Sequence, residues 1–183
     1  MELKHIFVDE DTQEGLHSIC LIKGGESEYD LLMDRLKNPI YIRRYCKQNI
    51  KYLQSGFYGN ITLEQAINEI RQEVWKIIEL LGKSSLSSIF KPLINTEYRI
   101  SALQKSKGKL TGKEFSKSKV RIYAIRIDEN TFVITGGAIK LTHEMKDHPD
   151  TEGERKKIDL VRDWLKNENL TTVDDLIYYY DEQ

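Results

Sequence analysis

The segment Lys119–Thr142, KVRIYAIRIDENTFVITGGAIKLT, constrains the fold more than any other part of the chain. In residues 120–127, Val120, Ile122 and Ala124 alternate with Arg121, Tyr123 and Ile125, and Ile127 follows. The residues Asp-Glu-Asn at 128–130 then supply a turn. A second β-branched and aromatic run fills 131–135, and Gly136-Gly137 interrupts it before the apolar character resumes. This pattern predicts two antiparallel strands joined by a short loop, with a third extended piece after a glycine kink, where the two glycines let the sheet bend or bulge.

Positive charge is concentrated just before this hairpin and inside it. Residues 99–126 hold nine Lys and Arg residues but a single acidic residue, Glu114, although the net charge of the chain is −1. Residues 141–183, in contrast, hold six basic and 12 acidic residues. A local excess of positive charge attracts polyanions, of which nucleic acid is the commonest, but a solvated lysine-rich loop has the same composition. The charge pattern alone leaves both interpretations open.

The remaining elements predict an α+β fold with a small, mostly antiparallel sheet and helices packed on it. Short apolar runs at 4–9 and 16–22 indicate an N-terminal hairpin, and a Lys/Ser/Gly-rich loop is expected over 104–118. Five helices are expected: one after a Ser27 cap, one from Pro39 to about Leu53, one over Thr62–Leu81, one over Thr151–Asn167 with a Thr151 cap, and one over Val173–Tyr180. A further strand is expected over Tyr98–Leu103. This order does not alternate as βαβ units do, which argues against a doubly wound nucleotide-binding fold.

Two parts of the chain are distinguished by these elements. Residues 1–95 form the N-terminal hairpin and a helical extension, and residues 96–183 form the sheet and the C-terminal helices. We expect the two parts to pack together as one unit, because 183 residues suit one domain with a substantial core.

Several classes of protein and site are disfavoured by composition and spacing. No apolar run approaches the roughly 20 residues that span a bilayer, and the N-terminus lacks a signal-peptide pattern, so we expect a cytoplasmic protein without membrane contact. Cys20 and Cys46 are too few and too isolated for a disulfide framework or a zinc site. His143 and His148 lack further ligands at metal-binding spacing, so we expect neither a metal nor a cofactor.

Basic and aromatic residues of the predicted hairpin form the candidate site. Arg121 and Tyr123 have the same parity in their strand, whereas Arg126 has the opposite parity, so only one arginine can join Lys140. An Arg-Tyr-Lys surface suits single-stranded RNA, because the cations bind phosphates and the ring stacks on a base. His143 follows at the end of the sheet and is a candidate general acid or base. An ordinary solvated face is the alternative.

The order of these motifs matches a known pattern. Arg121-Ile122-Tyr123 is followed by a second hydrophobic strand, the motif Gly-x-x-Lys-x-Thr at 137–142, a proline-containing loop and a helix with Glu154 and Arg162. Residues 99–167 thereby resemble the C-terminal half of the RelE/HigB/ParE superfamily of bacterial toxins. The resemblance implies a RelE-like fold and metal-independent cleavage of mRNA, with RNA, the ribosome and an antitoxin protein as the partners to test.

The resemblance also implies roles for individual residues. Arg121 matches the strand arginine that contacts the scissile phosphate, and Lys140 matches the basic residue after the glycine strand. Lys107 and Lys109 match the lysines of the strand that precedes them in the family. The predicted catalytic residues are Lys109, Arg121, Lys140 and His143, and the predicted RNA-binding residues are Arg99, Lys105, Lys107, Lys119 and Tyr123. Two other functions stay open: a non-catalytic nucleic-acid-binding regulator, and a protein-binding module such as a topoisomerase poison.

Overall fold

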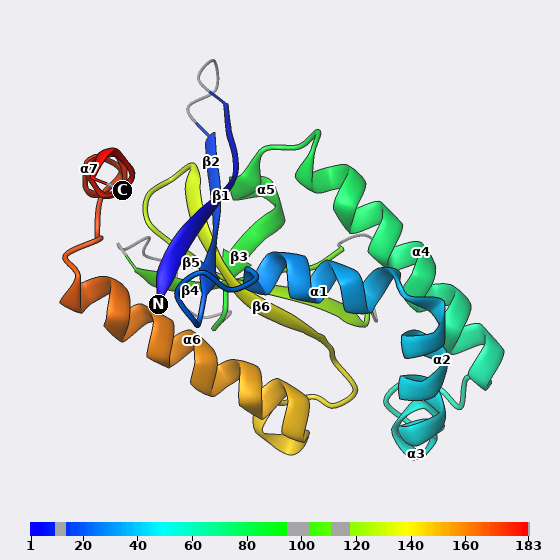
Figure 1. The fold of residues 1–183 in the computed structure, drawn as a ribbon. Coiled ribbons are helices and arrows are strands. Elements are labelled where there is room, and N and C mark those ends of the chain that lie inside the picture. The colour runs from blue at the N-terminus through cyan, green and yellow to red at the C-terminus, as the bar shows by residue number, and fades with distance from the viewer. Residues whose placement is uncertain (10–13, 95–102, 111–117, 183) are drawn as a thin grey trace.

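The protein has an α+β fold built on one six-stranded mixed sheet (Figure 1). The computed structural model describes residues 1–9, 14–94, 103–110 and 118–182. The strands are β1 (Glu2–Asp9), β2 (Glu14–Cys20), β3 (Phe90–Pro92), β4 (Gln104–Gly108), β5 (Val120–Arg126) and β6 (Thr131–Ile139), in the spatial order β1-β2-β6-β5-β4-β3. All neighbouring pairs are antiparallel except β2 and β6, which are parallel. Both parts of the chain therefore contribute strands to one sheet.

Helices cover both faces of this sheet. They are α1 (Glu28–Lys37), α2 (Pro39–Gln48), α3 (Ile50–Leu53), α4 (Leu63–Leu81), α5 (Leu86–Ile89), α6 (Pro149–Asn167) and α7 (Val173–Asp181), with a 3₁₀ turn η2 (Met145–Asp147). Helices α1, α2 and α4 pack with alternate residues of β5 and β6 in one hydrophobic core, and α6 and α7 pack with the opposite residues in a second core. No helix in the described ranges is long and apolar enough to cross a membrane.

Local capping explains where several helices begin, as expected from the sequence. The Ser27 hydroxyl accepts the Asp30 N–H at the start of α1, and Thr62 and Gln65 form a reciprocal capping box at the start of α4. The N-terminal hairpin is also confirmed, since β1 and β2 pair antiparallel. These features depend on residues that are close together in the chain, and for that reason the sequence alone predicts them.

Three local predictions are wrong. Part of the expected lysine-rich loop is the strand β4, because its backbone pairs with β3 on one side and β5 on the other. Helix α6 begins at Pro149 and not at Thr151, because the His148 ring accepts the Asp150 N–H as a cap and proline suits the first turn. The helix expected from Pro39 breaks at Asn49 into α2 and α3. Most of the strand expected over 98–103 lies outside the described residues, and Leu103 occupies a turn with positive φ.

The two glycines produce the expected bulge but no separate third piece, because Gly136 and Gly137 both pair with β5 and β6 continues through them to Ile139. The pairing register of β5 and β6 shifts between Tyr123 and Ala124, which leaves Thr135 as an extra residue in β6. Gly136 has φ +143°, and a side chain there would overlap the Glu154 carboxylate of α6. The bulge thus lets α6 approach the backbone of β6 closely.

Candidate nucleic-acid interface

Four cationic side chains gather at the end of the sheet where β4 and β6 end and β5 begins. Arg121 lies opposite Ala138 of β6, and the Lys140 N–H donates to the Lys119 carbonyl of the neighbouring strand at 2.7 Å. Lys107 lies opposite Tyr123, on the other side of β5, and Lys109 follows two residues later. We call Lys107, Lys109, Arg121 and Lys140 the cation cluster. The structure therefore brings together three of the four predicted catalytic residues.

The positive charges of the cation cluster act on one another. Burial, followed by the charges of Lys109, Lys140 and Arg121, lowers the pKa of Lys107 to about 8. Burial and Arg121 lower the pKa of Lys109, and burial, Arg121 and Lys109 lower that of Lys140. The pKa of the Arg121 guanidinium is lowered by burial. An anion placed among these groups would relieve both the lost hydration and the mutual repulsion.

Hydrogen bonds orient the cations without neutralising them. Arg121 Nη1 donates to the Val120 carbonyl at 2.8 Å and to the Ser118 hydroxyl at 3.2 Å, and Lys140 Nζ donates to the His143 carbonyl at 2.6 Å. In the described ranges, none of the ion pairs involves Lys109, Arg121 or Lys140. Their positive charge is therefore available to an external anion such as a phosphate.

A buried carboxylate of α4 holds the start of β5 in place. Glu73 Oε2 accepts the Lys119 N–H at 2.6 Å, the Val120 N–H at 2.8 Å and the Ser118 hydroxyl at 2.9 Å. The Glu73 side chain is only 4% exposed, and burial raises its pKa. Because Arg121 is the next residue, these bonds position its side chain. Sequence reasoning missed Glu73, although a glutamate within the apolar stripe of a predicted helix signals a buried polar partner.

The segment after α3 joins the helical layer to the cation cluster. The Tyr58 hydroxyl donates to the Lys140 carbonyl, and the Phe57 ring lies 4.1 Å from the His143 ring. His143 is exposed and lies in the loop after β6, three residues beyond Lys140. Sequence reasoning also missed Tyr58, which carries no motif and is brought here by tertiary packing.

Tyr123 does not lie on an open surface, contrary to the prediction from strand parity. Its side chain is 1% exposed and packs in the core beneath α6, where its hydroxyl finds no hydrogen-bond partner among the described residues. The prediction failed because helix α6 covers the face of β5 that parity assigned to solvent. Arg126 does point to the other face, where its guanidinium lies 5.6 Å from the Phe132 ring centroid. Stacking of a base on Tyr123 is therefore excluded.

Two predicted RNA-binding lysines have carboxylate partners. Lys119 is 2% exposed, pairs with Glu69 of α4, and lies 4.7 Å from the centroid of the Tyr58 ring. Lys105 Nζ lies 3.0 Å from Asp159 Oδ1 of α6. Both lysines hold helices against the sheet, which corrects their placement on a free surface. Arg99 lies outside the described residues.

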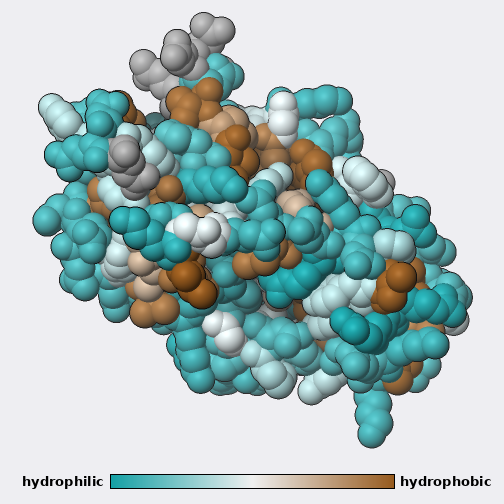
Figure 2. Space-filling model, in the orientation of Figure 1, coloured by the Kyte–Doolittle hydropathy of each residue, from teal (hydrophilic) through white to brown (hydrophobic). Residues whose placement is uncertain are grey.

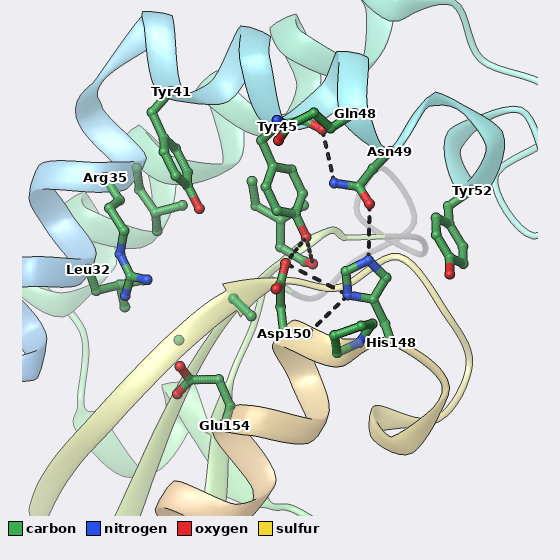
Figure 3. A pocket seen from close by; sticks show the side chains of 15 residues that line it. Leu32, Arg35, Tyr41, Tyr45, Gln48, Asn49, Tyr52, His148, Asp150 and Glu154 are labelled. Carbon is green, nitrogen blue, oxygen red and sulfur yellow. Dashed lines mark hydrogen bonds and ion pairs between the residues drawn. The ribbon is translucent and has the colours of Figure 1, made fainter.

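A separate cavity of about 600 Å³ lies between α2 and α6 (Figure 3). The Tyr45 hydroxyl donates to Asp150 Oδ2 at 2.8 Å, and a His148 ring nitrogen lies 3.1 Å from Asn49 Oδ1. These contacts fasten α2 to the start of α6. The cavity is lined by the carboxylates of Asp150 and Glu154 but by only one Lys or Arg side chain, Arg35, so it suits phosphate less well than the cation cluster does.

Comparison of the chain with protein-family models, curated proteins and solved structures gave no match. Among the described residues, no group of three His, Cys, Asp or Glu side chains could hold a metal ion. A functional interpretation therefore depends on the cation cluster and on the sequence motifs around it.

Proposed function

We propose that this protein is a RelE/HigB-like toxin of a toxin–antitoxin pair, and that it cuts RNA at the cation cluster without a metal. The observation that carries the proposal is the gathering of Lys109, Arg121 and Lys140, without ion-pair partners in the described ranges, at one end of the sheet. A phosphodiester is the anion that such a site suits best, because its charge grows as the reaction proceeds.

The proposed reaction is attack of a ribose 2′-hydroxyl on the adjacent phosphorus. The new P–O2′ bond forms as the P–O5′ bond breaks, so the products are a 2′,3′-cyclic phosphate and a 5′-hydroxyl. Arg121 and Lys140 stabilise the negative charge on the non-bridging oxygens, and Lys109 adds to the positive potential. A base takes the proton of the 2′-hydroxyl, and an acid returns one to O5′.

Two groups suit the proton transfers. The Lys107 amine has a pKa lowered to about 8, so a fraction of it is neutral near neutral pH. The His143 imidazole is exposed on the loop whose carbonyl binds Lys140 Nζ. In this proposal one of them acts as the base and the other as the acid.

The test is cleavage of RNA by the purified protein, with and without ribosomes, in the presence of EDTA. We expect a cut that ends in a cyclic phosphate, and loss of that cut when a single 2′-deoxynucleotide replaces the ribose at the site. Arg121→Ala and Lys140→Ala should each reduce the rate by about 10²-fold or more, because each removes a charge from the transition state. Expression of the wild-type protein in bacteria should arrest growth, and the double variant should relieve the arrest.

A matched control uses a lysine away from the sheet. Lys83 is exposed and pairs with Glu79, so Lys83→Ala should leave cleavage unchanged. Intact RNA and normal growth with the wild-type protein would contradict the proposal, as would equal rates for Arg121→Ala and Lys83→Ala.

A second candidate is a non-catalytic RNA-binding regulator that uses the same cluster. Arg121 and Lys140 already donate hydrogen bonds to backbone carbonyls. This favours the second function, because binding of a phosphate requires only the positive charge of the two side chains. RNA binding that weakens steeply with salt, without any cleavage, would select this function. Capture of one protein partner in a nuclease-resistant complex would instead select a protein-binding module.

A further inference from the structure

A second basic surface lies on the helical layer, outside the region that suggested RNA. Residues 35–63 contain six basic residues and no acidic residue. Four of them are exposed on α2 and α3, namely Arg43, which pairs with Glu64, and Arg44, Lys47 and Lys51. Arg44 and Lys47 are three residues apart and so lie on one side of α2, and Lys51 follows in α3. We call Arg44, Lys47 and Lys51 the α2–α3 basic surface.

This surface differs from the other charged helices of the protein. Helix α6 has five basic and five acidic residues, which form many ion pairs within the helix. Across the described ranges, Arg44, Lys47 and Lys51 have neither an ion pair nor a side-chain hydrogen bond, whereas their neighbour Arg43 pairs with Glu64 at 3.0 Å. Unbalanced charge of this kind creates a positive potential that a mixed helix surface lacks.

The α2–α3 basic surface offers more charge than aromatic surface. The tyrosines of these helices, Tyr41, Tyr45 and Tyr52, line the cavity on their inner side (Figure 3). Tyr52, next to Lys51, is 37% exposed, and its ring lies 5.0 Å from the ring of His148. Pro39 and Ile40 flank the cations on the outer side, in a shallow hollow that they share with Arg44 and Lys47. Binding of single strands relies on stacking between bases and rings, whereas binding of duplex RNA relies on contacts to its backbone. The surface therefore suits phosphates of base-paired nucleic acid.

A membrane surface fits these residues less well. An interfacial helix needs an exposed apolar face, but Ile42, Tyr45 and Cys46 of α2 are buried in the core. Ile40, which is 77% exposed, is a single apolar side chain among cations. The lower right part of Figure 2, where α2 and α3 lie, is correspondingly mostly hydrophilic.

The α2–α3 basic surface is connected to the cation cluster through the chain that follows it. Phe57 and Tyr58, a few residues after Lys51, contact the ring of His143 and the carbonyl of Lys140. The segment that follows the α2–α3 basic surface thus reaches the end of the sheet that carries the cation cluster, and this connection suggests one RNA with a paired and an unpaired part as the ligand of both.

We propose that the α2–α3 basic surface binds the phosphate backbone of a base-paired RNA segment that adjoins the single-stranded segment held at the cation cluster. The choice of RNA over DNA rests on the proposed ribonuclease function. The charge and exposure of Arg44, Lys47 and Lys51 are independent of that function.

The test measures binding of the full chain to three labelled probes by fluorescence anisotropy. The probes are an RNA hairpin with a single-stranded tail, the tail alone, and a DNA hairpin with the same tail in DNA. The variant is Arg44→Gln/Lys47→Gln/Lys51→Gln. The matched control, Lys76→Gln/Lys83→Gln/Lys91→Gln, removes three positive charges from exposed side chains elsewhere. Circular dichroism and thermal unfolding check that both variants are folded.

We expect the α2–α3 variant to bind the RNA hairpin at least about tenfold more weakly, with a slope of log Kobs against log salt less steep by about 2 to 3. Binding of the tail alone should change by less than about twofold, and the control should resemble the wild type. A loss no larger than that of the control, an equal loss for the DNA hairpin, or binding only to vesicles that contain anionic lipid would each overturn the inference. A selective loss for the RNA hairpin in a protein that cuts no RNA would support the inference while refuting the proposed ribonuclease.

Discussion

Replacing Glu73 by alanine should damage the candidate site without touching any of its cations. The Glu73 carboxylate accepts two backbone N–H groups of the buried segment Ser118–Val120, and its loss leaves both donors without that partner. Each unsatisfied buried donor costs about 1–3 kcal/mol, so Glu73→Ala should lower the free energy of unfolding by about 2–6 kcal/mol. Glu73→Gln keeps one accepting oxygen and loses only the charge-assisted part, about 1 kcal/mol for each bond.

The assay is urea unfolding, followed by circular dichroism, together with RNA binding at a urea concentration where each variant is folded. Glu79→Ala is the control, because Glu79 is an exposed glutamate of the same helix whose ion pairs with Lys76 and Lys83 are screened by solvent and contribute little to stability. Glu73→Gln should also weaken RNA binding, because Arg121 follows directly after the anchored residues. Equal stability of Glu73→Ala and Glu79→Ala would refute the reasoning.

Three further predictions concern the cluster, the bulge and the cavity. RNA affinity should fall as pH rises through about 8, where Lys107 loses its charge, and Lys107→Met should flatten this dependence in anisotropy titrations at constant ionic strength. Gly136→Ala should destabilise the fold by about 2–4 kcal/mol in urea unfolding, because its positive φ and the nearby Glu154 carboxylate both oppose a side chain. Tyr45→Phe should cost about 1–2 kcal/mol by the same assay, because its hydroxyl donates to Asp150.

Each of these predictions has an opposing outcome. A pH profile unchanged by Lys107→Met would show that another group titrates. Wild-type stability of Gly136→Ala would mean that β6 and α6 can separate at low cost. A Tyr45→Phe protein as stable as the wild type would show that the link between α2 and α6 contributes little.

The cation cluster was only partly predictable from the sequence. Arg121 and Lys140 were identified from strand alternation and from the motif that follows the glycines, and in the structure the charge of Arg121 contributes to the lowered pKa of Lys140. Lys119 was misjudged because the same alternation cannot reveal that Glu69 of a distant helix binds it. Exposure of a strand residue depends on which helix packs above it, and parity alone does not contain that information.

The sequence by itself determined the elements whose signals are local. Alternation defined β5, a β-branched and aromatic run defined the first part of β6, and caps and helical periodicity defined α1 and α4, because the residues involved are neighbours along the chain. Only the tertiary structure decided that 104–108 is a strand, since its polar sequence extends by pairing with both neighbours. It also decided the surroundings of the cations, because the partners that anchor or bury them come from α4, α6 and the segment after α3. Contacts between residues far apart in the chain produce no repeating pattern in the sequence, so the sequence does not predict them. Such contacts determine the electrostatics of this site.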